Sequence, residues 1–281
     1  MEFPILIDLN LGDGVKNFIM YLTTSHADIF KIIKKSVLQF LLHLQGGMLA
    51  IPWFVYILVV FLLGWKLKSL KSGIFYAIMI FFIGNLGYWE DTILTLAIVL
   101  ASVIISLIFG IPLGILCAYK ERAERIVRPI LDAMQTMPSF VYLIPAIMFF
   151  GLGNVPAVFA TTIYSLPPVI RLTTLAIKSV SDDMIEAANS FGANFWQKLF
   201  KVELPQAVPT IMAGVNQTTM MAMAMVVVSS MIGAKGLGYN VLVAINRADI
   251  SMGFEAGISI VFLAIVIDRL TQAVANKYNY S

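Results

Sequence analysis

Long apolar runs alternate with short polar segments along most of this 281-residue chain. A helix needs about 20 mainly apolar residues to cross the hydrocarbon core of a membrane, and charged residues, glycine or proline usually bound such a run. The run at 138–151 is short for a crossing. An alternative is that its helix begins earlier, near Leu131, and contains Pro138 and Pro145, which membrane helices tolerate. The pattern predicts seven transmembrane helices, at 49–65, 74–89, 92–118, 138–151, 155–177, 206–232 and 254–270.

The composition supports an all-α, polytopic membrane protein. Hydrophobic residues make up 59% of the chain and charged residues 12%, with a mean hydropathy of +0.88. Soluble domains are about 45–50% apolar and about 25% charged, so a soluble fold of this length is excluded. The single cysteine, Cys117, excludes an intramolecular disulfide and a cysteine-based metal site. A net charge of +3 gives no reason to expect nucleic-acid binding.

Lysine and arginine are distributed unevenly over the polar segments. With the N-terminus outside and the C-terminus inside, 13 of the 19 basic residues fall in inner segments and six in outer segments. Cytoplasmic loops of membrane proteins carry such an excess of basic residues. We therefore expect a multi-pass protein of the cytoplasmic membrane with its N-terminus outside and its C-terminus inside.

The N-terminal quarter differs from the rest. Residues 1–25 are expected to form an extracytoplasmic tail, and residues 26–47 an amphipathic helix that Gln45, Gly46 and Gly47 end. Three lysines on the polar side oppose a crossing and favour a helix lying on the outer leaflet. The alternative is a helix packed on the protein's own outer surface. Residues 48–89 then supply two additional transmembrane helices, and residues 90–281 form the core.

The segment 181–205, between the fifth and sixth runs, has the pattern of two short helices on the cytoplasmic side. Asp182, Asp183 and Glu186 suit the positive end of a helix dipole, and Gly192 permits a sharp turn. A second helix with an apolar face would follow and end at Pro205. The segment is therefore expected to be a compact projection that fits a cleft in a soluble partner.

The order Glu186-Ala187-Ala188, Gly192 and Val202-Glu203-Leu204-Pro205 closely resembles the EAA loop of binding-protein-dependent ABC importer permeases. The one departure is Val202, where the family pattern has isoleucine. The resemblance covers roughly residues 90–270, the five-helix core of type I (MetI-like) permeases. The alternative is an ordinary amphipathic connector. The resemblance implies contact with an ATPase through Asp182, Asp183, Glu186, Ala187, Ala188, Gly192, Trp196, Val202, Leu204 and Pro205.

Other segments are similar to one branch of that family, the glycine betaine/proline betaine (OpuA/ProU-type) permeases. They lie at 89–92, 110–114, 135–139 and 232–238, and the N-terminal extension supports the same branch. This resemblance implies import of glycine betaine or a related compatible solute for osmoprotection. Choline, carnitine or another quaternary amine is the alternative substrate, and an ion-coupled secondary carrier is a more distant alternative.

The resemblance also implies an assembly of two copies of this chain, two ATPase subunits and an extracytoplasmic substrate-binding protein, in contact with membrane lipid. ATP and magnesium would bind the ATPase, because the chain has no GxxxxGK[S/T] loop of its own. We expect no enzymatic activity, no catalytic residue and no cofactor on this chain. His26 and His43 are isolated from other ligand types, so no metal site is expected.

Polar residues inside the sixth run are candidates for the translocation pathway. Polar side chains in hydrocarbon are costly unless they face protein or a water-filled path. Hydrogen bonding between packed helices would explain them equally well. The candidates are Asn216, Gln217, Thr218, Thr219, Ser229 and Ser230. Ionisable residues inside the runs are scarce, which weakens the case for an ion-coupled carrier.

Overall fold

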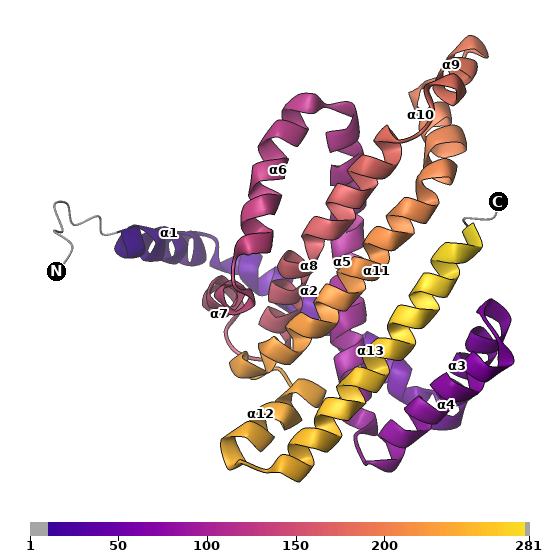
Figure 1. Ribbon diagram of the computed structural model, residues 1–281. Helices are drawn as coiled ribbons and strands as arrows, with labels where there is room; N and C mark the ends of the chain where they lie inside the picture. The colour runs from indigo at the N-terminus through magenta and orange to yellow at the C-terminus, as the bar shows by residue number, and fades with distance from the viewer. Residues whose placement is uncertain (1–10, 279–281) are drawn as a thin grey trace, which may run out of the picture.

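The computed structural model describes residues 11–278, and every element in that range is helical. In chain order the elements are α1 (Leu11–Ser25), α2 (Ala27–Ala50), α3 (Trp53–Leu67), α4 (Leu70–Asn85), α5 (Trp89–Tyr119), α6 (Glu121–Thr136), η1 (Ser139–Tyr142), α7 (Leu143–Phe150), α8 (Asn154–Lys178), α9 (Asp182–Ser190), α10 (Phe195–Lys198), η2 (Leu199–Glu203), α11 (Leu204–Val228), η3 (Ser229–Ile232), α12 (Leu237–Arg247) and α13 (Ile250–Tyr278). In Figure 1, α9 and α10 protrude at one end of the helical body and α12 lies at the other. We call these the α9 end and the α12 end.

Helices α5, α8 and α11 form the core, and small residues allow them to pack closely. A Cβ on Gly110 of α5 would lie 2.4 Å from Val169 Cγ1, and one on Gly114 would lie 2.6 Å from Thr173 Cβ. Ser106 Oγ lies 3.2 Å from Ser165 Oγ across the same interface. Small residues and short hydroxyl side chains are the usual means by which helices approach each other in membranes. The contact between α5 and α8 therefore leaves no room for larger side chains at these positions.

Two hydrogen bonds to side chains of α5 join the α12 end to the core. Leu237 N donates to Thr95 Oγ1 at 2.9 Å, and Asn240 Nδ2 donates to Asp91 Oδ2 at 2.6 Å. A Cβ on Gly238 would lie 2.8 Å from Val227 Cα. These contacts fix α12 against the start of α5 and the end of α11.

Each of the seven predicted runs overlaps a helix, but 49–65 and 74–89 also extend across non-helical residues between helices. Four helical segments are individually long and apolar enough to cross a membrane: Trp89–Tyr119, Asn154–Lys178, Phe195–Ile232 and Ile250–Ala275. The number rises to six if two bent pairs, α2 with α3 and α6 with η1–α7, each count as one crossing, and α4 is a shorter apolar helix. Within residues 11–278, the amphipathic helices α6 and α12 were missed as separate elements, α6 because its charged residues placed it in a polar loop and α12 because it is too short for a crossing.

The helix expected near Leu131 is correct only up to Met137. Leu131 lies in α6, but the chain bends by 113° between α6 and η1–α7. Met137, which precedes Pro138, has extended backbone angles, φ −73° and ψ 133°. The ring of a proline disfavours the helical conformation in the preceding residue, which explains the bend.

The N-terminal region departs from the prediction in two ways. The part of the expected tail within the described residues forms α1, and residues 1–10 lie outside the described residues. Helix α2 does not end at Gly46 and Gly47; it continues to Ala50 and bends by 89° into α3. Pro52 accounts for the break, since glycine only weakens a helix whereas proline lacks the N–H that continues it.

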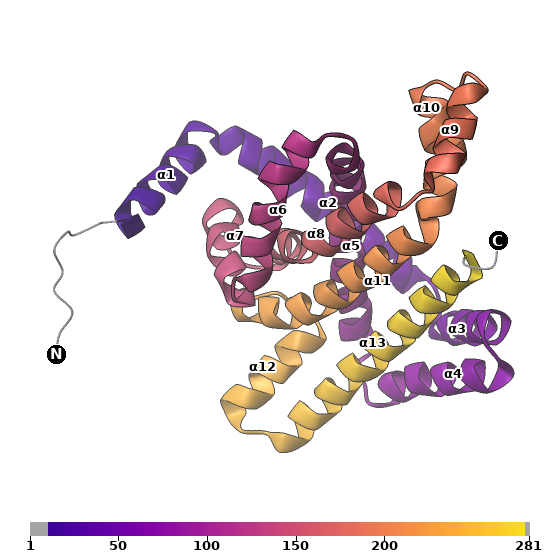
Figure 2. The ribbon, with the colours of Figure 1, turned by 45° about the horizontal axis from the view of Figure 1, so that its top comes forward.

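One side of α2 packs on the protein itself. Leu41 is 1% exposed, and the Phe30 ring stacks on that of Phe149 in α7 at 4.7 Å between centroids. Helix α1 extends away from the helical body (Figure 2). The packing on α5 and α7 agrees with the alternative of a helix on the protein's own surface, and a location on the outer leaflet stays a prediction.

Candidate coupling site and translocation pathway

Helices α9 and α10 form the projection expected at 181–205. Asp182 and Asp183 occupy the first turn of α9, and Gly192 follows its last turn with a φ of +71°. Ala193 N donates to Ala188 O at 3.0 Å, a bond that closes the end of the helix. A Cβ on Gly192 would meet nothing within 4 Å, so the turn needs glycine for its backbone conformation and not for space.

A capping box begins the second short helix. Asn194 Oδ1 accepts from Gln197 N at 2.9 Å, while Gln197 Oε1 accepts from Asn194 N at 2.9 Å. The two bonds satisfy backbone donors that the start of a helix leaves free. Sequence reasoning missed both residues, although the Asn-x-x-Gln spacing is a recognisable signal of this cap.

Pro205 does not end the second helix, contrary to the prediction. Helices α10, η2 and α11 follow one another without a break, and the apolar helical segment runs from Phe195 to Ile232. Element η2 is a π-helical turn in which Leu204 N donates to Leu199 O. Pro205 lies in the first turn of α11, where a missing N–H costs little. The projection is therefore continuous with a membrane helix.

A buried carboxylate anchors this continuous helix to the core. Glu203 in η2 is 2% exposed, and Tyr119 Oη at the end of α5 donates to its Oε2 atom. The Tyr119 ring also meets that of Phe195 at 4.9 Å. Glu203 was not among the residues expected to contact the ATPase, and its burial agrees with a structural role inside the protein.

Most of the predicted coupling residues lie on the surface of the projection. Exposed members are Asp182, Asp183, Glu186, Ala187, Gly192, Trp196 and Pro205; Val202 and Leu204 are half-buried, and Ala188 is buried in the turn. Phe191, which sequence reasoning missed, is 92% exposed. Trp196 is 63% exposed and stacks on Phe200 at 5.9 Å. Exposed aromatic side chains beside acidic ones are typical of a surface that binds another protein.

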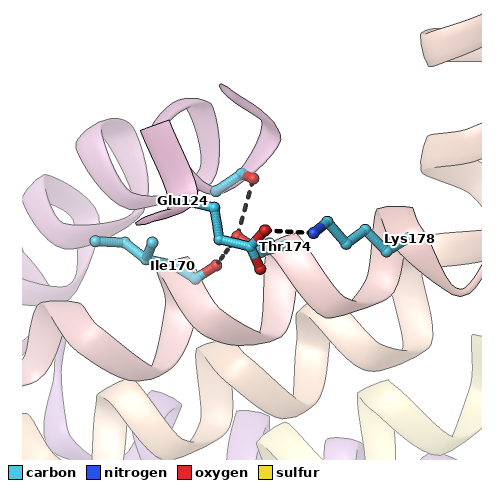
Figure 3. Close-up of polar contacts among 5 residues, drawn as sticks. Glu124, Ile170, Thr174 and Lys178 are labelled. Carbon is cyan, nitrogen blue, oxygen red and sulfur yellow. Dashed lines mark hydrogen bonds and ion pairs between the residues drawn. The ribbon is translucent and has the colours of Figure 1, made fainter. Parts of the chain in front are cut away.

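Two ion pairs connect α6 to α8 near the α9 end. Lys178 Nζ lies 2.5 Å from Glu124 Oε2, and Arg171 pairs with Asp132. Figure 3 shows the first pair beside Thr174, whose hydroxyl has two carbonyl acceptors within reach, Gly114 O at 3.0 Å and Ile170 O at 2.9 Å. A pocket of about 260 Å³ lies between the two helices. The partners are 54 and 39 residues apart in sequence, so local patterns could not reveal them.

The pathway candidates on α11 and η3 have different environments. Asn216 Nδ2 donates to Asp268 Oδ1 of α13 at 3.0 Å, which agrees with interhelical bonding for that residue. Thr219 and Ser229 donate to carbonyls of their own helix, at 2.8 Å and 2.9 Å. Ser230 is buried, and Thr218 is buried without a hydrogen-bond partner among the described residues. Gln217 alone among the six is exposed, and a pathway role for this set stays a prediction.

No group of three or more His, Cys, Asp or Glu side chains that could hold a metal ion occurs within the described range. The geometry thus defines an all-helical integral membrane protein with a surface projection joined to a membrane helix.

The chain belongs to the family of binding-protein-dependent transport system inner membrane components, whose model matches residues 110–280. It is therefore a multi-pass inner-membrane permease, a translocation subunit that is not itself catalytic, and the resemblance in segment 181–205 is confirmed at the level of the family.

Several relatives with named substrates are similar to this chain over most of its length. The glycine betaine/proline betaine transport system permease protein ProW of Escherichia coli is 47% identical over 94% of this chain and 75% of its own length. The glycine betaine/carnitine transport permease protein GbuB of Listeria monocytogenes is 52% identical over 80% of this chain and 81% of its own. The glycine betaine transport system permease protein OpuAB of Bacillus subtilis is 44% identical over 95% of both chains.

The solved structures support the fold. An inward-facing form of the MetNI methionine ABC transporter matches with a TM-score of 0.61 and 22% sequence identity. The match covers 66% of this chain and 92% of that one. The all-α, type I permease fold expected from sequence is confirmed.

Proposed function

We propose that this chain is the permease subunit of an ATP-driven importer that moves glycine betaine or a related compatible solute into the cell. The observation that carries the substrate class is the 47% identity to a glycine betaine/proline betaine permease over 94% of the chain. Three relatives share the words glycine betaine in their names, whereas carnitine occurs in only one of these three. Carnitine is therefore the second candidate substrate.

The assembly contains two copies of this chain, two ATPase subunits that bind ATP and magnesium, and an extracytoplasmic binding protein. The exposed face of α9 and α10, with Phe191, Trp196 and the acidic first turn, docks on the ATPase. In this arrangement the N-terminus is outside and the C-terminus inside. The α9 end is then cytoplasmic, and the α12 end faces the binding protein.

Nucleotide-driven motion reaches the membrane through the continuous helix that begins at Phe195. Closure of the ATPase dimer moves α9 and α10, and η2 transfers the movement to α11 without an intervening loop. The bond from Tyr119 to Glu203 carries the same movement to α5. The ligand and the nucleotide shift the population between inward-facing and outward-facing states by binding one state more tightly than the other.

Reconstitution in liposomes tests this function. Vesicles containing the chain and its ATPase, with ATP inside and binding protein outside, should accumulate radiolabelled glycine betaine without an ion gradient. Excess unlabelled carnitine, choline and proline betaine define the substrate range by competition. Uptake that requires an ion gradient and ignores ATP would refute the proposal, and preferential uptake of carnitine would select the second candidate.

A further inference from the structure

The α3–α4 hairpin packs tightly on itself but leaves spaces where it meets the core. A Cβ on Gly64 would lie 2.8 Å from Gly73 Cα, so the two helices of the hairpin are in close contact. Figure 2 shows the hairpin beside α13. A cavity of about 170 Å³ lies between the hairpin and the core, and one of about 320 Å³ lies within the hairpin beside Trp89; both are lined mainly by apolar side chains. A membrane protein with such cavities has room for lipid chains between its helices.

A separate groove of about 720 Å³ lies between α13 and the end of the hairpin where α3 turns into α4. Lys68, Lys71 and Arg269 form its rim, and Tyr76, Met79 and Ile265 line its apolar part. Tyr76 and Met79 are nearly buried, at 4% and 5% exposure. The groove thus combines a cationic mouth with an apolar floor.

The positive charge at the mouth is largely uncompensated. Among the described residues, no ion pair involves Lys68 or Lys71. Arg269 Nε lies 3.9 Å from Asp268 Oδ2, so this carboxylate compensates part of the charge of Arg269 while its other oxygen accepts from Asn216 and Gln272. Helix α4 begins at this mouth with Ser69 as its cap, but α3 ends at Leu67 beside it, so the two helix dipoles largely cancel and the charge of the mouth comes from its side chains.

Lipid is available at this position. Ile78 of α4 is 57% exposed, and Phe75 and Phe81, which also line the groove and the neighbouring cavity, are 54% and 55% exposed, as expected of a helix that faces hydrocarbon. A ligand that enters the groove from the membrane must therefore carry acyl chains. Because the mouth is cationic, the complementary headgroup is anionic.

We propose that this groove binds an anionic phospholipid. The phosphate lies between Lys68, Lys71 and Arg269, and an acyl chain follows Tyr76, Met79 and Ile265 along the groove. The lipid joins the hairpin to α13 and fills space that protein side chains leave open. If the α9 end is cytoplasmic, as the proposed function has it, this lipid belongs to the cytoplasmic leaflet. The binding of the lipid does not depend on the proposed function.

Native mass spectrometry of the purified full-length chain tests the proposal. The chain in detergent is titrated with an equimolar mixture of dioleoyl phosphatidylglycerol and dioleoyl phosphatidylcholine. The wild-type chain should retain phosphatidylglycerol selectively. A basic residue near an anionic lipid contributes about 1 kcal/mol, and 1.36 kcal/mol is a tenfold change, so Lys68→Gln with Lys71→Gln should weaken phosphatidylglycerol binding ~30-fold. Lys68→Arg with Lys71→Arg should restore it.

A matched control separates the groove from general attraction to basic residues. Arg122→Gln with Arg125→Gln removes two exposed charges of α6, near the same end of the molecule, and should change phosphatidylglycerol binding less than twofold. Ile265→Trp leaves the cationic mouth intact and fills the groove, so it should also release the lipid, with circular dichroism reporting that the helices are retained.

Three outcomes would overturn the proposal. The first is unchanged lipid retention in the Lys68→Gln, Lys71→Gln variant, and the second is an equal loss of lipid in the α6 control. The third is that the Lys68→Gln, Lys71→Gln variant loses the dimer of this chain and keeps the lipid. ATP-dependent uptake without selective lipid retention would remove this inference and leave the proposed function. Selective retention without ATP-dependent uptake would do the reverse.

Discussion

Removing the Tyr119 hydroxyl should loosen the coupling segment from the core. The change Tyr119→Phe keeps the ring that meets Phe195 at 4.9 Å but deletes the donor to Glu203, whose side chain is 2% exposed. A hydrogen bond to a charged group contributes about 1.5–3 kcal/mol, and a buried carboxylate cannot regain that bond from water. The population in which α10 and η2 detach from α5 should therefore rise ~10- to 150-fold, at 1.36 kcal/mol for each tenfold change.

Hydrogen–deuterium exchange measures this population directly. Amides of residues 195–203 should exchange faster in Tyr119→Phe by the same factor, because exchange follows local opening. Glu203→Gln keeps an acceptor for the hydroxyl and should have a smaller effect. In reconstituted importer, Tyr119→Phe should hydrolyse more ATP per molecule transported.

Tyr56→Phe is the matched control. Tyr56 Oη donates to Met48 O at 2.8 Å, far along the chain from the coupling segment, so its loss should leave exchange at 195–203 unchanged. Unchanged exchange in Tyr119→Phe, or an equal increase in Tyr56→Phe, would refute the anchoring role.

Three further predictions concern the turn, the ion pairs and the topology. Gly192→Asn should preserve the φ of +71°, whereas Gly192→Val should strain the turn by about 1–2 kcal/mol and weaken ATPase binding roughly tenfold in a pull-down titration; equal affinities would contradict this reading. Glu124→Lys and Lys178→Glu should each lower thermal stability at low salt, and the double exchange should restore it. The coupling energy should be no more than about 1 kcal/mol, because both side chains are partly exposed. A zero coupling energy would exclude a contribution from this pair. The orientation is tested with Cys117, the buried cysteine, replaced by serine. A membrane-impermeant maleimide should then label Ser25→Cys in intact cells and Lys201→Cys only after permeabilisation. The opposite labelling would reverse the proposed orientation.

Sequence was most informative where function depends on local pattern. The apolar runs located the membrane helices, because length and hydropathy are properties of a single segment. The order of Glu186, Ala188 and Gly192 identified the projection, since each residue serves the geometry of one helix–turn unit.

Sequence was least informative where distant segments meet. The bond between Tyr119 and Glu203 joins residues 84 apart, and its burial depends on three helices. Pro205 was misread because a proline that stops one helix is equally suited to the first turn of another, and only the preceding π turn distinguishes the two. Helix α6 was overlooked because its charged residues suggested a loop, although charge on one face is compatible with a helix at a membrane surface, and α12 was overlooked because its eleven residues are too few for a crossing.

The unbroken helix from Phe195 to Ile232 acts as a lever arm. Its 38 residues, at about 1.5 Å each, give a rod ~57 Å long. A tilt of about 10° at the end attached to the projection displaces the other end by ~10 Å, which is about the diameter of a helix. Just beyond that end α12 is bonded to the start of α5 through Leu237 and Asn240, so in the proposed transport cycle α12 and the start of α5 move together with α11. Amplification of this kind needs rigidity and length, and no chain of side-chain rearrangements has to carry the signal.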